Sequence, residues 1–401
     1  MQQQRLLVGV DVGCHKHHVA IGGPGGIVEQ FEITHDSKGF QYFFTQVAAQ
    51  ARRQKLPIVV VGMEGTNGYA RPLDQMIKDK GYHLLNVNNL KLARFKEIFA
   101  SPAKTDCIDA KQIVTLMMMA PFMEQMKETL QEVPVIGEVE MQLKRISRRR
   151  RQLVKEKVIL QNRMQADLQS VCPGFLDTIK QVDSLYVLRF LSFRSDLREL
   201  ARLKPATVRS IPGIGKTFAA KLARWQEIAA FGSEIAWVGP MISDDAKRIL
   251  ELKVKIDVLE KQMEKLIVQS SLGTLLLSIP GFGPVCTAEI TGEIGTMARF
   301  NSEPGFAIYL GMAPLDNSSG NYKGTKSPHQ VNKRAKAAMM VAMGHHIRKV
   351  AESKAYYQKK RAEGKKHNQA LRSLGRHLVR VIWSMAQNNR HYESKTEIVA
   401  A

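Results

Sequence analysis

RLLVGVDVGCHKHHVAIGGPGGIVEQFEIT, residues 5–34, is the stretch that decides how the chain begins to fold. It holds three short apolar runs, at residues 6–12, 18–22 and 27–33, with glycine-containing turns between them. Short runs of β-branched and apolar residues separated by glycine turns are typical of neighbouring antiparallel strands. The stretch therefore predicts a three-stranded antiparallel meander.

Helix and strand patterns alternate after this meander. Residues 37–54 have a helical pattern, and the apolar run 58–63 (IVVVGM) is typical of a strand buried on both faces. A second helix is expected over 69–80 and another strand over 83–87. Three antiparallel strands followed by helix, strand, helix and strand is the element order of an RNase H-like fold, so we expect such an α/β domain over residues 1–135.

Two heptad patterns lie within residues 136–272. The first consists of Val139, Ile146, Leu153 and Leu160, with Leu143, Met164 and Val171 interleaved. The second consists of Ile242, Ile249, Ile256 and Met263, with Leu252, Leu259 and Leu266 interleaved. Heptads of this kind predict the arms of a coiled-coil stalk, paired with each other or across a dimer. Two ordinary bundle helices are the alternative.

A short motif occurs twice, and each copy is expected to form the turn of a helix-hairpin-helix. The copies are Ser210-Ile-Pro-Gly-Ile-Gly215 and Ser278-Ile-Pro-Gly-Phe-Gly283. The glycines permit a tight turn, and the free N–H groups of the next helix start can hold a backbone phosphate without reading sequence. A packed helical turn is the alternative. The first copy lies in residues 172–238, which we expect to be a helical insertion in the stalk.

The C-terminal part, residues 273–401, is expected to be mostly helical, and it becomes strongly basic from about Ala335. Cations recur there with aromatic residues between them: Lys354, Lys359, Lys360, Arg361, Lys365, Lys366, Arg372, Arg376 and Arg380, with Tyr356, Tyr357 and Trp383. The density and single sign of these charges favour a nucleic-acid surface over a solvated helix face.

The overall composition indicates the same class of partner. The chain of 401 residues holds 59 Lys and Arg against 37 Asp and Glu, a net charge of +22. A polyanion is the commonest partner that relieves such self-repulsion. No apolar run approaches the roughly 20 residues of a membrane span, and the first residues lack a signal-peptide pattern. The four cysteines are scattered, so we expect a reduced cytoplasmic, nucleoid-associated protein without a zinc site or disulfide framework.

Four acidic residues stand where a metal ion could be held. Asp11 lies inside the first apolar run, and Glu64 follows the buried run directly. A carboxylate in such surroundings is costly unless it is exposed at the strand edge or holds a cation. Asp106 and Asp109 are three apart at the start of an expected helix and so share one helical face. Converging carboxylates predict Mg²⁺ or Mn²⁺ rather than zinc, and two such ions can assist phosphodiester cleavage.

Simpler roles stay open for single residues. Asp106 alone could be a helix N-cap, and Glu64 alone could end a strand. The three histidines that follow Asp11, at positions 15, 17 and 18, are expected on the surface rather than in a metal site.

Five blocks of sequence together resemble a known family. In chain order, and between about residues 7 and 345, they are GVDVGCHKHHVAI, GMEGTNGYARPL, NVNNLKLARFKEIFASPAKTDCIDAKQI, SIPGFGPVCTAEITGEIG and YLGMAPLDNSSGNYKG. The chain resembles the DEDD transposases of bacterial insertion sequences, which are serine-dependent recombinases guided by an element-encoded bridge RNA. The resemblance implies a RuvC-like N-terminal domain, a coiled-coil middle, a C-terminal transposase domain and a homo-oligomer, either a dimer or a tetramer of two dimers.

The resemblance also implies roles for individual residues. The four acids named above would be the catalytic metal ligands. The family's nucleophilic serine falls in the P-x-x-x-S-S-G segment, and we place it on Ser319, immediately before Gly320, with Ser318 as the close competitor. A serine hydroxyl is a weak nucleophile, and a metal pair held by the acids would stabilise the charge on phosphate and leaving oxygen. The product would be a covalent phosphoserine that allows resealing without ATP.

Two features depart from the family pattern. A glycine-asparagine pair commonly follows the serine, whereas the segment TKSPHQVNKRAKAAMM has Asn332 with no glycine before it. Lys333, Arg334 and Lys336 keep the positive charge there. The stretch 172–238 is additional to compact members of the family, and its role is RNA or DNA contact or spacing of the stalk.

Three functions follow as hypotheses. The first is an RNA-guided recombinase that joins donor and target DNA through phosphoserine. The second is a metal-dependent, junction-resolving endonuclease in which water attacks. The third is a DNA-architectural protein, which the four acids argue against, because ligand carboxylates are of no use to a phosphate-binding surface.

Overall fold

The computed structural model describes residues 5–64, 68–88, 92–93, 95, 97, 106–122, 129–320, 324–326, 328 and 331–393, with only the backbone of residues 106 and 107. The chain divides into two compact units, Met1–Val135 and Ile136–Ala401. Each unit is described below by itself.

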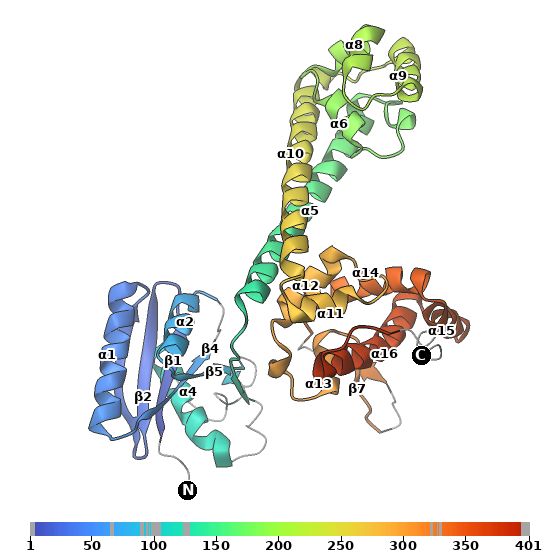
Figure 1. Ribbon diagram of the computed structural model, residues 1–401. Coiled ribbons are helices and arrows are strands. Elements are labelled where there is room, and N and C mark those ends of the chain that lie inside the picture. The colour runs from blue at the N-terminus through green and yellow to red at the C-terminus, as the bar shows by residue number, and fades with distance from the viewer. Residues whose placement is uncertain are drawn as a thin grey trace. The chain divides into compact units, whose positions relative to one another are not determined.

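The N-terminal unit is built on a six-stranded mixed sheet (Figure 1). Its strands are β1 (Arg5–Val12), β2 (Lys16–Gly23), β3 (Gly26–Thr34), β4 (Ile58–Glu64), β5 (His83–Val87) and β6 (Leu130–Glu132), in the order β3-β2-β1-β4-β5-β6. The first three strands are antiparallel, β4 runs parallel to β1 and β5 parallel to β4. The predicted α/β sheet is therefore confirmed, and its strand order is consistent with an RNase H-like arrangement. The short edge strand β6, antiparallel to β5, was not predicted.

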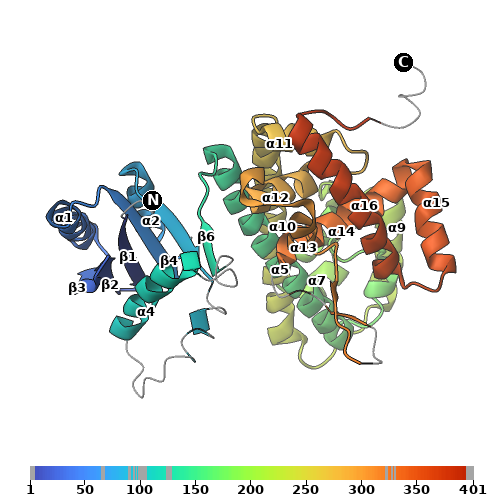
Figure 2. The ribbon, with the colours of Figure 1, turned by 90° about the horizontal axis from the view of Figure 1, so that it is seen from below.

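Helices cover both faces of this sheet (Figure 2). Successive strand residues point to opposite faces. On β1, Leu6, Val8 and Val10 accordingly pack in the cluster that contains α1 (Ser37–Arg53) and α2 (Arg71–Asp79). Leu7 on the other face packs with α4 (Asp106–Met119), which the short 3-10 helix η1 (Ala120–Phe122) follows.

The histidines after Asp11 do not all lie on the surface. His15 is exposed, but His17 lies in β2 and is fully buried. The His17 ring stacks on Phe40, and its Nε2 lies 2.8 Å from Nδ1 of His35. The expected surface position is wrong for His17, because the alternation of β2 turns this residue towards α1.

The second unit begins with two long antiparallel helices, α5 (Glu138–Val171) and α10 (Ile235–Ile267). Leu143 of α5 packs with Met263 and Ile267 of α10 at one end of the pair. Met164, Leu168 and Val171 pack with Ile242, Ala246 and Ile249 at the other end. The two heptad arms therefore pair with each other within one chain.

Short helices fill the connection between the stalk helices. They are η3 (Leu176–Thr178), α6 (Leu185–Leu191), α7 (Leu197–Ala201), α8 (Pro205–Ser210) and α9 (Lys216–Ile228). Their core contains three aromatic rings in mutual contact, those of Phe175, Phe190 and Trp225. A cluster of this size gives the stalk tip its own hydrophobic core.

The remaining chain is mostly helical, as predicted. It contains α11 (Ser271–Leu277), α12 (Pro284–Ile294), η4 (Met297–Arg299), α13 (Glu303–Tyr309), α14 (Lys333–Lys349), α15 (Ala351–Ala362) and α16 (His367–Asn388). Two short strands, β7 (Leu315–Asp316) and β8 (Thr325–Lys326), form a hairpin after α13. These helices and the stalk belong to one unit, and the boundary expected between residues 272 and 273 stays a prediction. None of the helices described is both long enough and apolar enough to cross a membrane.

The two S-I-P-G turns have the same conformation. Gly213 and Gly281 have positive φ angles of 91° and 95°, which favour glycine. In each copy the proline carbonyl accepts a hydrogen bond from a neighbouring helix, at 2.9 Å from Nη1 of Arg189 in the first and at 2.5 Å from Nδ1 of His346 in the second. The repeated motif is therefore a repeated structure, with α8 and α9 around one turn and α11 and α12 around the other.

Candidate functional site

Glycines in the sheet let α4 approach the strands closely. A Cβ atom on Gly9 would lie 2.4 Å from the carbonyl oxygen of Ala110, and one on Gly62 would lie 2.5 Å from Sδ of Met117. Such distances leave no room for a larger residue unless the helix moves away. Gly9 and Gly62 are paired in the parallel register of β1 and β4. The glycines therefore fix where α4 crosses these two strands.

The same geometry places Asp11 beside Glu64. Asp11 stands two residues after Gly9, and Glu64 stands two residues after Gly62. Side chains two residues apart on a strand point to the same face, so both acids point to the face that α4 covers. Both lie at the carboxyl ends of adjacent parallel strands, and both side chains are half-buried. Two acids that are 53 positions apart in sequence thus become neighbours.

The direction of α4 brings its first turn to the same end of the sheet. Ala110 lies over Gly9, whereas Met118 lies over Gly22, which is paired with Leu7 further back along β1. Helix α4 therefore runs antiparallel to β1. Its first turn, which carries the half-buried Asp109, points towards the ends of β1 and β4.

Three of the four predicted acids are thus gathered on one face at one end of the sheet. The side chain of the fourth, Asp106, lies outside the described residues, although its backbone begins α4. Among the side chains that the structure describes, no three His, Cys, Asp or Glu residues come close enough to hold a metal ion. The donors are carboxylates on the α4 face, a set that suits a hard divalent cation. Their placement fits a metal site, but they do not close around one.

The predicted serine lies in the second unit, on the β7–β8 hairpin. The N–H of Asn317 donates to the carbonyl of Gly324 at 2.9 Å and holds the two sides together. Ser318 and Ser319 are both exposed beyond this bond, and Gly320 has a positive φ of 55°. The turn thus presents both hydroxyls to solvent, and exposure does not choose between them.

Asn332 has a structural role that its sequence context did not reveal. Its side-chain oxygen accepts hydrogen bonds from the N–H groups of Arg334 and Ala335 and so caps α14. Its Nδ2 donates to Glu293 at 2.8 Å and to the hydroxyl of Tyr309 at 2.7 Å. The asparagine therefore joins the segment after the serine hairpin to α12 and α13.

Sequence reasoning also missed two buried acids on α12. Glu289 and Glu293 are buried, and each forms a bidentate pair with an arginine of α5, Arg151 and Arg148 respectively. The sequence feature that could have revealed them is spacing. The two acids are four residues apart and the two arginines are three apart, so each pair shares one face of its helix. These pairs fasten the base of the stalk to the helices that support the serine hairpin.

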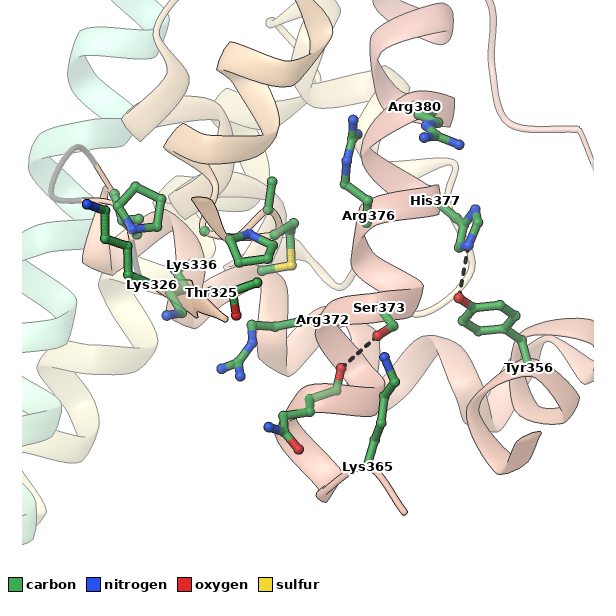
Figure 3. A pocket seen from close by; sticks show the side chains of 17 residues that line it. Thr325, Lys326, Lys336, Tyr356, Lys365, Arg372, Ser373, Arg376, His377 and Arg380 are labelled. Atoms are coloured by element: carbon green, nitrogen blue, oxygen red, sulfur yellow. Dashed lines mark hydrogen bonds between the residues drawn. The ribbon is translucent and has the colours of Figure 1, made fainter. Parts of the chain in front are cut away.

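A basic cavity of about 720 Å³ lies next to the serine hairpin (Figure 3). Pro314, Thr325 and Lys326 of the hairpin form part of its wall. The other cations lining it come from α14, α16 and the turn before α16: Lys336, Lys365, Arg372, Arg376 and Arg380, with His377 beside them. No carboxylate is among the described residues that line it.

Only some of the cations of the basic tail line this cavity. Lys365, Arg372, Arg376 and Arg380 line the cavity, whereas Lys354, Lys359 and Lys366 do not. Two of its aromatic residues have structural contacts, since Trp383 packs against Phe306 in the core and Tyr357 hydrogen-bonds His367 at 2.7 Å. Which of these cations contact nucleic acid stays a prediction, and four of them converge on the cavity.

Comparison with known proteins identifies the family. A family model of DEDD transposases of the IS110 type, described as transposase, matches residues 8–173, and a model described as the IS116/IS110/IS902 transposase family matches residues 273–358. The first match contains the four acids, and the second contains Ser318 and Ser319.

Similar proteins span almost the whole chain. The insertion element IS116 44.8 kDa protein of Streptomyces clavuligerus is 24% identical over 399 residues, which cover 97% of this chain and 96% of the relative. The insertion element IS900 42 kDa protein of Mycobacterium paratuberculosis is 26% identical over 345 residues, 83% of this chain and 84% of the relative. The putative transposase of the IS117 mini-circle of Streptomyces coelicolor is 22% identical over 410 residues, 97% of this chain and 96% of the relative.

The two family models match in the order in which the units occur, and they cover both the sheet with the acids and the hairpin with the serines. Transposition requires DNA as the substrate. The chain therefore belongs to the IS116/IS110/IS902 transposase family and is a DNA transposase of a bacterial insertion element.

Proposed function

We propose that this transposase cuts and rejoins donor and target DNA through a covalent phosphoserine on Ser319. The observation that carries the proposal is the placement of the predicted residues. Asp11, Glu64 and Asp109 lie on the α4 face at the same end of the sheet, and Ser319 is exposed on a hairpin that borders a basic cavity.

The acids supply the metal-binding half of the site. Asp11, Glu64, Asp106 and Asp109 would hold Mg²⁺, or Mn²⁺, through carboxylate oxygens. A bound divalent cation would stabilise the negative charge that develops on the phosphate and the leaving oxygen. Carboxylates at the exposed end of the sheet can take this role, because the apolar strands behind them hold the backbone rigid.

The serine supplies the bond-exchanging half. Its Oγ attacks phosphorus, the bond from phosphorus to the sugar oxygen breaks, the serine proton is released and the sugar oxygen takes up a proton. Attack by a sugar hydroxyl of another strand reverses these steps and restores the free serine. The phosphodiester energy is kept in the phosphoserine, so no ATP is needed.

The two halves belong to different compact units, so the site requires the units of one subunit or of two subunits to come together. A dimer or tetramer would allow the second arrangement. An element-encoded RNA would choose donor and target by base pairing, and the protein would act in the cytoplasm at the nucleoid. The positive charge of the chain supports such polyanionic partners.

The test is to incubate the protein with junction DNA of its element, the RNA and Mg²⁺, and to look for a protein–DNA adduct by denaturing electrophoresis and peptide mapping. We expect an adduct on Ser319 that disappears in Ser319→Ala and persists in Ser318→Ala. An adduct lost only in Ser318→Ala would move the nucleophile by one residue. Cleavage without any adduct, retained in both variants, would contradict the proposal and indicate a junction-resolving endonuclease that uses water.

The acids are tested in the same assay. Asp11→Asn and Glu64→Gln keep the side-chain shape and remove the charge, so we expect folded proteins that form no adduct. Asp79→Asn, an exposed acid on α2 on the opposite side of the sheet, is the matched control. Normal recombination by Asp11→Asn would show that the acids are not catalytic.

A further inference from the structure

The cavity beside the serine hairpin holds several cations that no carboxylate among the described residues neutralises. Arg376 is paired with Glu303 of α13. Lys326, Lys336, Lys365, Arg372 and Arg380 have no ion pair with any carboxylate that the structure describes. Five arginines of the stalk differ, since each has a carboxylate partner: Arg148, Arg150, Arg151, Arg163 and Arg248. Unpaired cations that converge on a hollow favour an anionic ligand.

The electrostatics of His377 agree with this view. Burial lowers the pKa of this histidine, and the neighbouring Arg380, Arg376 and Lys360 lower it further. Its Nε2 lies 3.0 Å from the hydroxyl of Tyr356. The part of this lowering that comes from the three cations indicates a positive potential along this side of α16.

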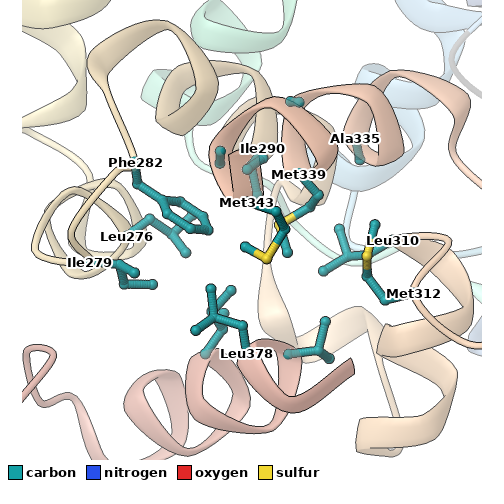
Figure 4. Packing of buried hydrophobic residues seen from close by; sticks show 14 of the residues in the cluster. Leu276, Ile279, Phe282, Ile290, Leu310, Met312, Ala335, Met339, Met343 and Leu378 are labelled. Carbon is teal, nitrogen blue, oxygen red and sulfur yellow. The ribbon is translucent and has the colours of Figure 1, made fainter. Parts of the chain in front are cut away.

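The cations of α16 form a row. Arg372, Arg376 and Arg380 are four residues apart, so they lie above one another on one face, about 6 Å apart along the helix axis. The opposite face of α16 packs Leu374, Leu378 and Ile382 into the core, where Leu378 faces the cluster of Met339 and Met343 (Figure 4). The row is therefore held on a fixed helix. It is too long for one phosphate and suits a chain of phosphates.

Part of the wall is apolar. Met312, Pro314, Pro328 and Val331 line the cavity together with the cations. A volume of about 720 Å³ is in the range of ligand sites rather than of packing defects. Apolar surface beside a track of cations suits a sugar and base next to their phosphates, as in proteins that bind single strands. A duplex would keep its bases covered and would leave this apolar wall unused.

We propose that this cavity binds the sugar–phosphate backbone of a single nucleic-acid strand, with the phosphates beside Arg372 and Arg380 and the sugar and base against the apolar part of the wall. This cavity assignment deepens the proposed function, because it puts a nucleic-acid strand beside the serine hairpin. The link between the bound strand and strand cutting rests on the proposed function. DNA and RNA strands share this chemistry, and the experiment separates them.

The test measures binding of fluorescein-labelled oligonucleotides to the full chain by anisotropy, in EDTA, as a function of salt concentration. The variant is Arg372→Gln with Arg380→Gln. The matched control is Arg52→Gln with Arg53→Gln, which removes the same charge from exposed positions at the end of α1. The ligands are single-stranded DNA, single-stranded RNA and duplex DNA of equal length.

We expect the cavity variant to bind single strands at least about tenfold more weakly than the control variant. The negative slope of log K against log salt should become less steep by about 1.4, because each lost phosphate contact contributes about 0.7 for a single strand. A loss confined to DNA or to RNA names the strand that occupies the cavity, and an equal loss shows that the backbone alone is recognised. Unchanged single-strand binding, or an equal loss for duplex DNA, overturns the proposal.

This experiment does not depend on the serine chemistry. Binding is measured without metal, and Ser319→Ala should bind as the unmodified chain does. If no adduct ever forms but the cavity variant still loses single strands, the proposed function fails and the cavity assignment stands. If the cavity variant forms adducts normally and also binds single strands normally, the cavity assignment fails and the proposed function stands. Equal thermal unfolding of both double variants verifies that the fold is intact.

Discussion

Arg148 and Glu293 form a bidentate ion pair between α5 and α12, with Nε to Oε1 at 2.6 Å and Nη2 to Oε2 at 2.8 Å. Only 1% of the Glu293 side chain is exposed, whereas 36% of the Arg148 side chain is. Burial opposes the ionisation of Glu293, but the hydrogen bonds from Arg148 and Asn332 outweigh it and lower its pKa. A buried carboxylate is thus kept charged by its partners.

Removing the arginine should leave this charge without compensation. We expect Arg148→Met to lower the free energy of unfolding by about 3–5 kcal/mol, the usual cost of breaking a buried pair from one side. Arg149→Met, at the exposed neighbouring position, should change it by less than about 0.5 kcal/mol. Urea unfolding followed by circular dichroism measures both. Recovery of part of the loss by adding Glu293→Gln would attribute it to the buried charge, and equal stability of the two arginine variants would contradict this account.

The buried His17 should make the N-terminal unit sensitive to acid. Burial, and then His35 and His18, lower its pKa from 6.5 to about 4. The folded state thus prefers the neutral ring, so the stability that His17 contributes is complete above pH 6.5 and is lost as the pH falls towards 4. The loss is at most about 3 kcal/mol, from about 1.4 kcal/mol per pKa unit.

His17→Phe should remove this sensitivity. Its free energy of unfolding should fall less between pH 7 and pH 4.5 than that of the unmodified chain, as measured by urea titration at each pH. His15→Phe alters an exposed histidine of the same segment and should keep the original pH dependence. A parallel pH dependence in all three proteins would show that His17 titrates normally.

The glycines under α4 should be intolerant of any side chain. Gly9→Ala would place Cβ 2.4 Å from the carbonyl oxygen of Ala110 and push the helix outward. We expect a loss of about 1–3 kcal/mol, as in overpacked cores, and reduced adduct formation because Asp109 moves with α4. Gly25→Ala, where nothing lies within 4 Å of the new atom, is the control. Unfolding curves and adduct yield that match this control would show that α4 does not depend on the close approach.

Metal binding should be visible without catalysis. A ligand that binds only the folded state stabilises it according to its concentration, so Mg²⁺ should raise the unfolding temperature of the N-terminal transition. The rise should vanish in EDTA and in Asp11→Asn with Glu64→Gln, but persist in Asp79→Asn. The measurement is a thermal scan with increasing Mg²⁺. An equal rise in all three proteins would place the metal elsewhere.

Some of the site could be predicted because the relevant information is local. Asp11 interrupts an apolar strand and Glu64 ends one, and local composition reveals both positions. The buried role of Glu289 and Glu293 was not predicted, because their segment TAEITGEI reads as an ordinary helix until Arg148 and Arg151 arrive from α5. Arg150 stands seven residues after Leu143, where the interleaved set of the first heptad pattern would have an apolar residue. Its role likewise becomes clear only in the structure, where its Nε lies 2.6 Å from Oε1 of Glu260 on the other stalk helix.

The sequence by itself determined the order of β1 to β5 and of the helices between them, the two heptad arms, the repeated S-I-P-G turns and the positions of the four acids. These features follow from periodicity, glycine and charge along the chain, which act over a few residues at a time. Only the tertiary structure decided that the heptad arms pair within one chain, that α4 runs antiparallel to β1, and that cations without an ion pair to any described carboxylate converge beside the serine hairpin. Each of these depends on which surfaces bury apolar area against each other, and residues far apart in sequence meet only when the whole unit has packed.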